Sequence, residues 1–301
     1  MILPSYEQDI RLTELRAESA AELHELFVGR TTVDAWQHER MVKCVTPLAA
    51  AYPGASWLTV GDSVGLDAWL LQAACGVRNV SASSISDARL RKAKELGFLD
   101  GIAIRAINAE QIDLADSAVD FLLCKQAYHH FPRPPVAFYE FMRVARIGLV
   151  LIEPAESPTR PLDILRMVAK VLLRRRRPAY EMFEPVGNYI YRISERDIFR
   201  MLAALHLRWF AIKTFNNFNS ARLAKWPRDS RSARLIFQVA VGVQDVLVSS
   251  HLISPGLCVV FVPTGPDAES AQATLRASDF KIVTIPENPY AAADYVRPFL
   301  P

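Results

Sequence analysis

Two stretches of the chain carry residue types that could do chemistry. In the first, Gly61 and Gly65 flank the turn Asp62-Ser63-Val64, which follows an apolar run and precedes apolar residues at helical spacing. Glycines let a backbone approach a ligand closely, and a helix N-terminus offers unpaired N–H groups, so such a turn suits a nucleotide-like ligand. The dinucleotide fingerprint G-x-G-x-x-G is absent. A plain strand-to-helix turn is therefore the alternative interpretation.

The second stretch is the pair His129-His130, which follows the apolar run 119–124. Histidine titrates close to neutral pH and can take the proton of an attacking hydroxyl. We therefore expect His129 or His130 to be a catalytic base; the alternative is a structural role, in which both histidines hydrogen-bond the loop. Lesser candidates for the base are Tyr128, Glu153 and Glu156.

The elements that position these residues alternate between strand and helix. Apolar and β-branched runs predict strands at 57–60, 79–84, 102–107, 119–124 and 147–152. Helical spacing and capping signals predict helices between them, one after Gly65, one capped by Ser86 and one begun by Pro134-Pro135. Strands that alternate with helices form a parallel, doubly wound sheet, whose carboxyl edge faces the ligand.

Several motifs then occur in the order typical of one enzyme family. They are Asn108-Ala109-Glu110, the run 117–131, the run 140–146 and Leu151-Ile152-Glu153-Pro154. With them, residues 55–155 resemble class I S-adenosylmethionine-dependent methyltransferases, most closely the small-molecule and polysaccharide-cluster branch. The resemblance implies S-adenosylmethionine as cofactor and a small-molecule acceptor. We expect O-methylation of a small hydroxylated acceptor such as a sugar or glycan unit.

The resemblance also implies which residues surround the cofactor. Around the methionine portion it places Gly61, Asp62, Ser63 and Gly65, with Asp62 paired to the ammonium and backbone N–H groups facing the carboxylate. It places Ser84 at the ribose, Asn108, Ala109 and Glu110 at the adenine edge, and Lys125 with Gln126 near the methyl group.

Two positions depart from the family pattern. Thr59 stands where family members usually carry a carboxylate, and Ser84 stands where an acid usually grips both ribose hydroxyls. A hydroxyl forms weaker hydrogen bonds than a carboxylate, by about 1 kcal/mol, although Asp87 could reach the same hydroxyls. The departures keep open a second hypothesis, a degenerate methyltransferase-fold protein that binds cofactor or partner without catalysis.

Composition and charge bound the other possibilities. The chain has 301 residues, 51% of them hydrophobic and 22% charged, which is ordinary for a globular protein. It has no apolar run long enough to span a membrane and no signal-peptide pattern at its start, so we expect a cytoplasmic location. The four cysteines are widely scattered, which argues against a zinc site and a disulfide framework, and we expect no metal.

The charge is unevenly distributed. Residues 160–234 contain 17 Lys and Arg against 6 Asp and Glu in a chain whose net charge is +3. This excess suggests an anionic partner, which could be a phosphorylated or carboxylated substrate, a nucleotide sugar or a lipid surface. Nucleic acid is not expected, because Lys125-Gln126-Ala127-Tyr128 lacks the Asn/Asp-Pro-Pro-Tyr type signature of base methylators.

The expected architecture is an α/β, doubly wound, Rossmann-like seven-stranded sheet with an N-terminal helical cap (1–55) and a methyltransferase domain (56–301). Later runs predict strands at 207–215 and 257–262, an appended strand at 280–285 and a buried helix at 235–248. A helical and aromatic lid is expected at 156–204, where the aromatic stretch 183–192 suits either a sugar ring or core filling. Its apolar helix and the following Arg174–Arg177 could contact a membrane peripherally through 162–177; a lid helix packed on the protein is the favoured interpretation.

Overall fold

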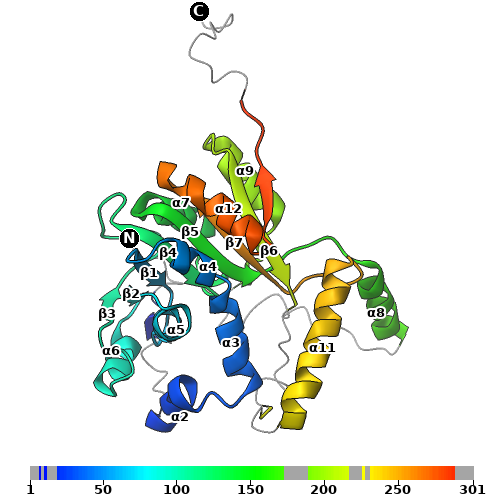
Figure 1. Ribbon diagram of the computed structural model, residues 1–301, viewed down its shortest axis with the longest axis horizontal. Helices are drawn as coiled ribbons and strands as arrows, with labels where there is room; N and C mark the ends of the chain where they lie inside the picture. The colour runs from blue at the N-terminus through cyan, green and yellow to red at the C-terminus, as the bar shows by residue number, and fades with distance from the viewer. Residues whose placement is uncertain are drawn as a thin grey trace, which may run out of the picture.

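The computed structural model describes residues 7, 10–11, 19–172, 189–216, 226–227 and 231–288. An eight-stranded sheet in the order β3-β2-β1-β4-β5-β7-β6-β8 forms its centre (Figure 1). The strands are β1 (Ser56–Val60), β2 (Asn79–Ser84), β3 (Ala103–Ala106), β4 (Val119–Lys125), β5 (Ala145–Pro154), β6 (Trp209–Phe215), β7 (Leu257–Pro263) and β8 (Lys281–Thr284). The first five run parallel, whereas β7 is antiparallel to β5 and β6.

The predicted α/β, doubly wound fold is confirmed, with one difference in the sheet. It has eight strands rather than seven, because β8 pairs antiparallel with β6 along the whole of its length. Without β8, the N–H and C=O groups on the outer side of β6 would form an open sheet edge, which proteins commonly cover. β8 therefore becomes the outer edge strand, and its four residues keep that edge short.

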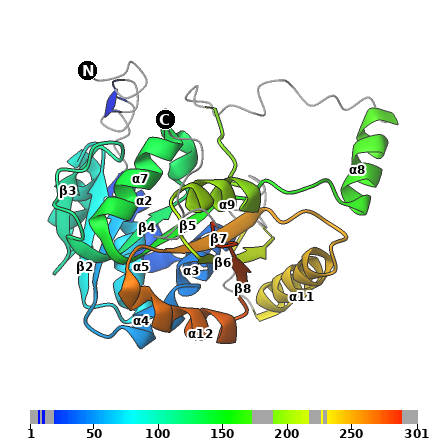
Figure 2. The same cartoon turned by 90° about the horizontal axis from the view of Figure 1, so that it is seen from above.

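Helices cover both faces of the sheet (Figure 2). On one face lie α3 (Val33–Lys43), α4 (Thr46–Ala51), α5 (Leu66–Cys75), α6 (Ala88–Glu95) and α12 (Glu269–Ala277), and on the other α7 (Pro134–Val144) and α9 (Glu195–Ala204). Side chains of β4 alternate between the two cores: Phe121 and Leu123 join the first, Leu122 and Cys124 the second. This alternation follows from the two-residue period of a strand, and it explains why the middle of β4, residues 121–124, is continuously apolar.

Local signals in the sequence set several helix starts. The Thr32 hydroxyl accepts a hydrogen bond from the Ala35 N–H at 3.3 Å at the start of α3, and Ser194 does the same for Asp197 at 3.1 Å in α9. Pro134 begins α7. These caps satisfy N–H groups that have no partner within the helix. Ahead of α3 lie the short helices α2 (Ala20–His24) and η1 (Glu25–Gly29).

Two helices stand beyond the β6–β7 part of the sheet, α8 (Pro161–Leu172) and α11 (Arg231–Ser249), at the same end of the molecule in Figures 1 and 2. The Leu162 N–H donates to the Leu252 carbonyl at 3.1 Å, which ties the start of α8 to the turn after α11. None of the helices in the described ranges is long and apolar enough to cross a membrane.

Both helices expose apolar side chains, which corrects two expectations. On α8 these are Ile164, Leu165, Met167, Val168 and Leu172, and on α11 they are Leu235, Ile236, Val239, Val243 and Val246. The helix at 235–248 is therefore not buried, since only one side, with Phe237, Val241 and Val248, turns inward. The favoured packing of the 162–172 helix on the protein is likewise wrong. Arg174–Arg177 and residues 183–188 lie outside the described part of the chain.

Candidate functional site

The turn after β1 lies against the loop after β4. Gly61 has φ +76°, and a Cβ built on it would lie 2.4 Å from the Ala127 Cβ. No side chain fits in that space, and the positive φ favours glycine as well. The glycine therefore brings the predicted cofactor turn into contact with the loop that carries His129 and His130.

The turn offers N–H groups to a ligand. The Asp62 N–H donates to the Ser83 carbonyl at 2.8 Å, but the N–H groups of Ser63 and Val64 have no acceptor among the described residues. They lie just before α5, where the helix dipole also favours negative charge. The Ser63 hydroxyl accepts a hydrogen bond from Arg89 of α6. An anionic group, such as a carboxylate, therefore fits the backbone of this turn.

The Asp62 side chain is bonded within the chain. Its carboxylate is 4% exposed and accepts from the Thr59 hydroxyl at 2.9 Å, the Ala68 N–H at 2.9 Å and the Asp67 N–H at 3.1 Å. Burial, together with the neighbouring Asp67 carboxylate, raises the pKa of Asp62 to about 7. Asp62 thus caps α5, and Thr59, which replaces the usual carboxylate, holds it in place. The expected pairing of Asp62 with an ammonium group stays a prediction.

Lys125, expected near the methyl group, belongs to a buried polar cluster at the end of β4. Its ammonium lies 2.9 Å from the Asp67 carboxylate and 2.8 Å from Nδ1 of His38 on α3. The side chains of Lys125 and Asp67 are only 3% and 8% exposed. The Lys125 charge, with burial, holds the pKa of His38 well below its ordinary value, so neutral Nδ1 accepts from the ammonium. The cluster joins β4, α5 and α3.

The residues expected at the ribose and adenine lie along the same edge. Ser84 ends β2 and is buried. The Asn108 side chain accepts the Glu110 N–H at 2.9 Å, and the buried Glu110 carboxylate accepts from the Arg133 N–H at 2.6 Å and its Nε at 2.5 Å. Ala109, between them, is buried. Glu110 thus ties the loop after β3 to the start of α7.

The loop after β4 is organised by Glu153 of β5, whose side chain is fully buried. Its Oε1 accepts the N–H groups of Ala127 and Tyr128, each at 2.9 Å, and its Oε2 lies 2.6 Å from Nδ1 of His129. A carboxylate only accepts hydrogen bonds, so this geometry assigns the Nδ1 proton to the bond with Glu153. Nε2 is then the nitrogen that can accept a proton.

The other polar groups of this loop differ in their surroundings. The His130 ring lies 4.2 Å from the His129 ring between centroids and is partly exposed. Within the described structure, the Gln126 Nε2 and the Tyr128 hydroxyl are buried without a hydrogen-bond partner. Gln126 also has φ +53°, a left-handed conformation that ends β4 at this point. His129 is thus held by the buried Glu153 carboxylate.

Sequence reasoning named Glu153 and His129 separately and missed their pairing; it missed His38 entirely. The register of the parallel strands contains the signal for the pairing. Lys125 of β4 aligns with Ile152 of β5, so Glu153 follows beside the loop after β4. For His38 no such signal exists, because its position depends on how α3 packs over the sheet.

The family described as a methyltransferase domain matches residues 58–152, from β1 to β5. Among solved structures, geranyl diphosphate C-methyltransferase from Streptomyces coelicolor A3(2), in complex with Mg²⁺, geranyl diphosphate and S-adenosylhomocysteine, is similar at 16% identity and a TM-score of 0.50, covering 88% of this chain and 100% of its own. The [4+2]-cyclase SpnF is similar at 15% identity and a TM-score of 0.50, covering 88% and 98%.

The YcgJ protein from Bacillus subtilis is 16% identical over 76% of this chain and 99% of its own, with a TM-score of 0.49. The chain matches none of the curated proteins at a significant level. At these identities the two structures with a TM-score of 0.50 establish the fold alone, while the family match and the motifs concern strands β1 to β5. Residues 58–152 thus match a methyltransferase domain, in agreement with the S-adenosylmethionine-dependent methyltransferases that the sequence resembles.

Proposed function

We propose that the protein is an S-adenosylmethionine-dependent O-methyltransferase that acts on a small hydroxylated acceptor, such as a sugar or glycan unit. The observation that carries this proposal is the hydrogen bond of 2.6 Å between Nδ1 of His129 and the buried Glu153 carboxylate. A histidine whose Nδ1 proton is held by a carboxylate presents Nε2 as a general base.

The residues of the β1 turn fit the cofactor. The N–H groups of Ser63 and Val64 would hold its carboxylate, and the Ser84 hydroxyl would meet the ribose. Asn108, Ala109 and Glu110 would line the adenine edge, although the Glu110 carboxylate already faces Arg133. When bound, S-adenosylmethionine supplies an electrophilic methyl group and leaves as S-adenosylhomocysteine.

The remaining work falls to the loop after β4. His129 would take the hydroxyl proton at Nε2 as the acceptor oxygen attacks, while Glu153 holds the ring in one orientation and stabilises the charge that forms on it. The N–H bonds of Ala127 and Tyr128 to the same carboxylate fix the loop to β5. The alignment of acceptor and methyl group depends on this rigidity.

The two histidines provide a matched test. His129→Gln and His130→Gln would be assayed separately for turnover, by the mass shift of candidate acceptors, and for S-adenosylhomocysteine binding by calorimetry. We expect His129→Gln to lower turnover by about 10²–10⁴-fold, the range for loss of a general base, while cofactor binding is retained. His130→Gln should remain within a few-fold of the wild type. Full turnover in His129→Gln contradicts the assignment.

A specific observation favours a second candidate, a methyltransferase-fold protein that binds a ligand without catalysis. Two polar residues expected at the cofactor, Asp62 and Glu110, are bonded within the chain, and Ser84 replaces the ribose acid. Titration with S-adenosylmethionine separates the candidates. Affinity in the micromolar range supports the enzyme, whereas no binding at millimolar concentration supports the non-catalytic protein.

A further inference from the structure

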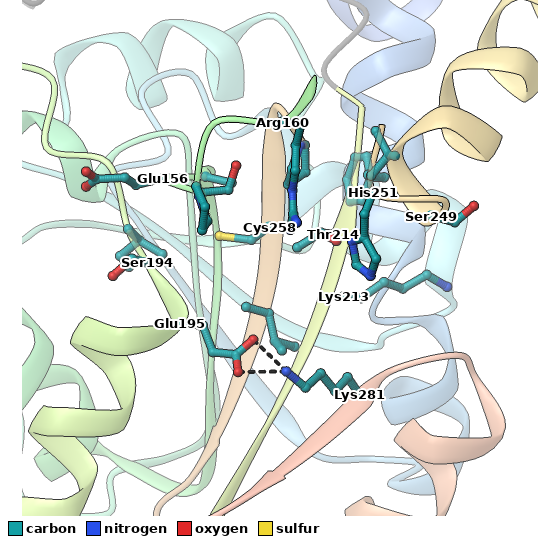
Figure 3. A pocket seen from close by; sticks show the side chains of 18 of the residues that line it. Glu156, Arg160, Ser194, Glu195, Lys213, Thr214, Ser249, His251, Cys258 and Lys281 are labelled. Atoms are coloured by element: carbon teal, nitrogen blue, oxygen red, sulfur yellow. Dashed lines mark hydrogen bonds and ion pairs between the residues drawn. The ribbon is translucent and has the colours of Figure 1, made fainter. Parts of the chain in front are cut away.

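A cavity of about 990 Å³ lies at the β5, β7 and β6 part of the sheet (Figure 3), and the residues that line it do not include those of the β1 turn. Its walls come from the segment after β5, the start of α9, strand β6, the inner side of α11 and the start of β8. Part of this wall is apolar, formed by Ile193, Phe199, Ile212, Phe215 and Val248. A pocket of this size can enclose a ligand about as large as a typical small-molecule substrate.

The charged groups of the cavity are mostly paired with one another. Lys281 lies 2.7 Å from Glu195, at one end of the cavity in Figure 3. Arg40 lies 2.5 Å from Asp245, and Lys213 lies 4.0 Å from Asp279. Each carboxylate in the cavity wall therefore has a cation beside it, apart from the exposed Glu156.

Arg160 differs from these paired cations. No carboxylate of the described residues lies within ion-pairing distance of its guanidinium, which points into the cavity in Figure 3. Among the described residues, its Nε is buried without a hydrogen-bond partner, and so are the Ser157 hydroxyl and Nη1 of Arg40, both in the same wall. Arginine can only donate hydrogen bonds. Three buried donors in one cavity call for acceptor atoms, which an anionic ligand would provide.

The cavity adjoins the proposed base through the backbone. The Tyr191 N–H donates to the His129 carbonyl at 3.4 Å, and Ile193, two residues later, lies in the cavity wall. The Ile193 N–H donates to the Pro154 carbonyl at 3.1 Å, and the Glu156 N–H donates to the Ile193 carbonyl at 2.8 Å. Residues 191–193 therefore connect the loop of His129 to the cavity.

We propose that this cavity is the acceptor site, and that it selects a hydroxylated acceptor that also carries an apolar part and an anionic group, a phosphate or a carboxylate, bound by Arg160 and Ser157. Naming the ligand as the methyl acceptor rests on the proposed function; anion binding in the cavity does not. The apolar wall takes the body of the ligand, and the unpaired donors take its charged oxygens.

Calorimetric titration with octyl phosphate, octanoate and octan-1-ol tests the proposal, because the three probes share one chain and differ in charge. Charge-assisted hydrogen bonds contribute about 1.5–3 kcal/mol, so we expect an anionic probe to bind at least about tenfold more tightly than the alcohol. The tighter of the two anions identifies the head group as phosphate or carboxylate. Equal binding of all three probes would overturn the proposal.

Two variants locate the binding. Arg160→Gln should weaken binding of the anionic probe about tenfold and leave octan-1-ol binding unchanged, and Ser157→Ala should weaken anion binding a few-fold. The control is Arg166→Gln, on the exposed side of α8, which lies outside the cavity wall and should bind like the wild type. Wild-type affinity for the anion in both cavity variants, or an equal loss in Arg166→Gln, would overturn the assignment of the site.

A separate titration distinguishes failure of the proposed function from failure of the anion site. S-adenosylhomocysteine is titrated into the same protein samples. Anion binding that depends on Arg160, without cofactor binding, upholds the cavity as an anion site and contradicts the methyltransferase activity. Cofactor binding without preference for the anionic probes upholds the activity and contradicts the anionic acceptor.

Discussion

Replacement of Glu153 by glutamine tests the centre of the site without relying on a known acceptor. Glutamine keeps one carbonyl oxygen, which can still accept the N–H groups of Ala127 and Tyr128, now bonded at 2.9 Å each. Its amide N–H₂ then faces Nδ1 of His129, where the carboxylate oxygen lies at 2.6 Å. Two donors cannot share that bond, so the His129 proton must move to Nε2. The nitrogen proposed as base then carries a hydrogen.

The expected magnitudes follow from these three bonds. Glu153→Gln loses one charge-assisted hydrogen bond, and we expect the free energy of unfolding to fall by about 1.5–3 kcal/mol. Glu153→Ala leaves three buried donors without their acceptor, each costing about 1–3 kcal/mol, so the loss should be at least about 3 kcal/mol. Turnover in Glu153→Gln should fall by about 10²–10⁴-fold, as for a base held in the wrong tautomer.

The assays are urea unfolding and ¹⁵N NMR of the His129 ring, which distinguishes the protonated from the unprotonated nitrogen. Glu156→Gln is the matched control, since Glu156 is exposed and lies three residues further along. It should change neither stability nor the tautomer. Wild-type stability together with protonated Nδ1 in Glu153→Gln would refute the reasoning.

Three further predictions concern other parts of the fold. Lys125→Met leaves Asp67 buried without its cation and should lower the free energy of unfolding by about 3–5 kcal/mol, against less than about 1 kcal/mol for the exposed control Lys43→Met, by urea unfolding; equal effects contradict the buried pair. The pKa of Asp62 is raised to about 7, so the folded protein keeps a proton that the unfolded chain has released, and this group makes the free energy of unfolding fall as pH rises from about 4 to about 7. Asp62→Asn should remove that contribution, so the difference in the free energy of unfolding between wild type and variant should change over this pH range. A difference that stays constant contradicts the raised pKa of Asp62. The exposed apolar face of α8, where Leu165 is 63% exposed, should bind anionic vesicles, so that the protein sediments with them. The Leu165→Ser variant should sediment less, and unchanged sedimentation excludes a membrane contact through this face.

The sequence by itself determined the elements whose signals are local. Alternating strands and helices, the caps at Thr32 and Ser194 and the proline start of α7 depend on residues within one or two turns of each other, so spacing predicts them. The glycine turn after β1 and the order of the motifs also predicted the domain family, because these features are short and follow one another along the chain.

Only the tertiary structure decided which of these residues meet. Asp62 bonds α5 rather than standing open, Lys125 meets Asp67 and His38, and Glu153 holds His129, because strand register and helix packing bring together residues far apart in the chain. The exposure of the apolar faces of α8 and α11 also depends on tertiary packing. An apolar periodic helix looks alike whether a neighbour covers it or not, so its burial depends on the space that the rest of the fold leaves beside it.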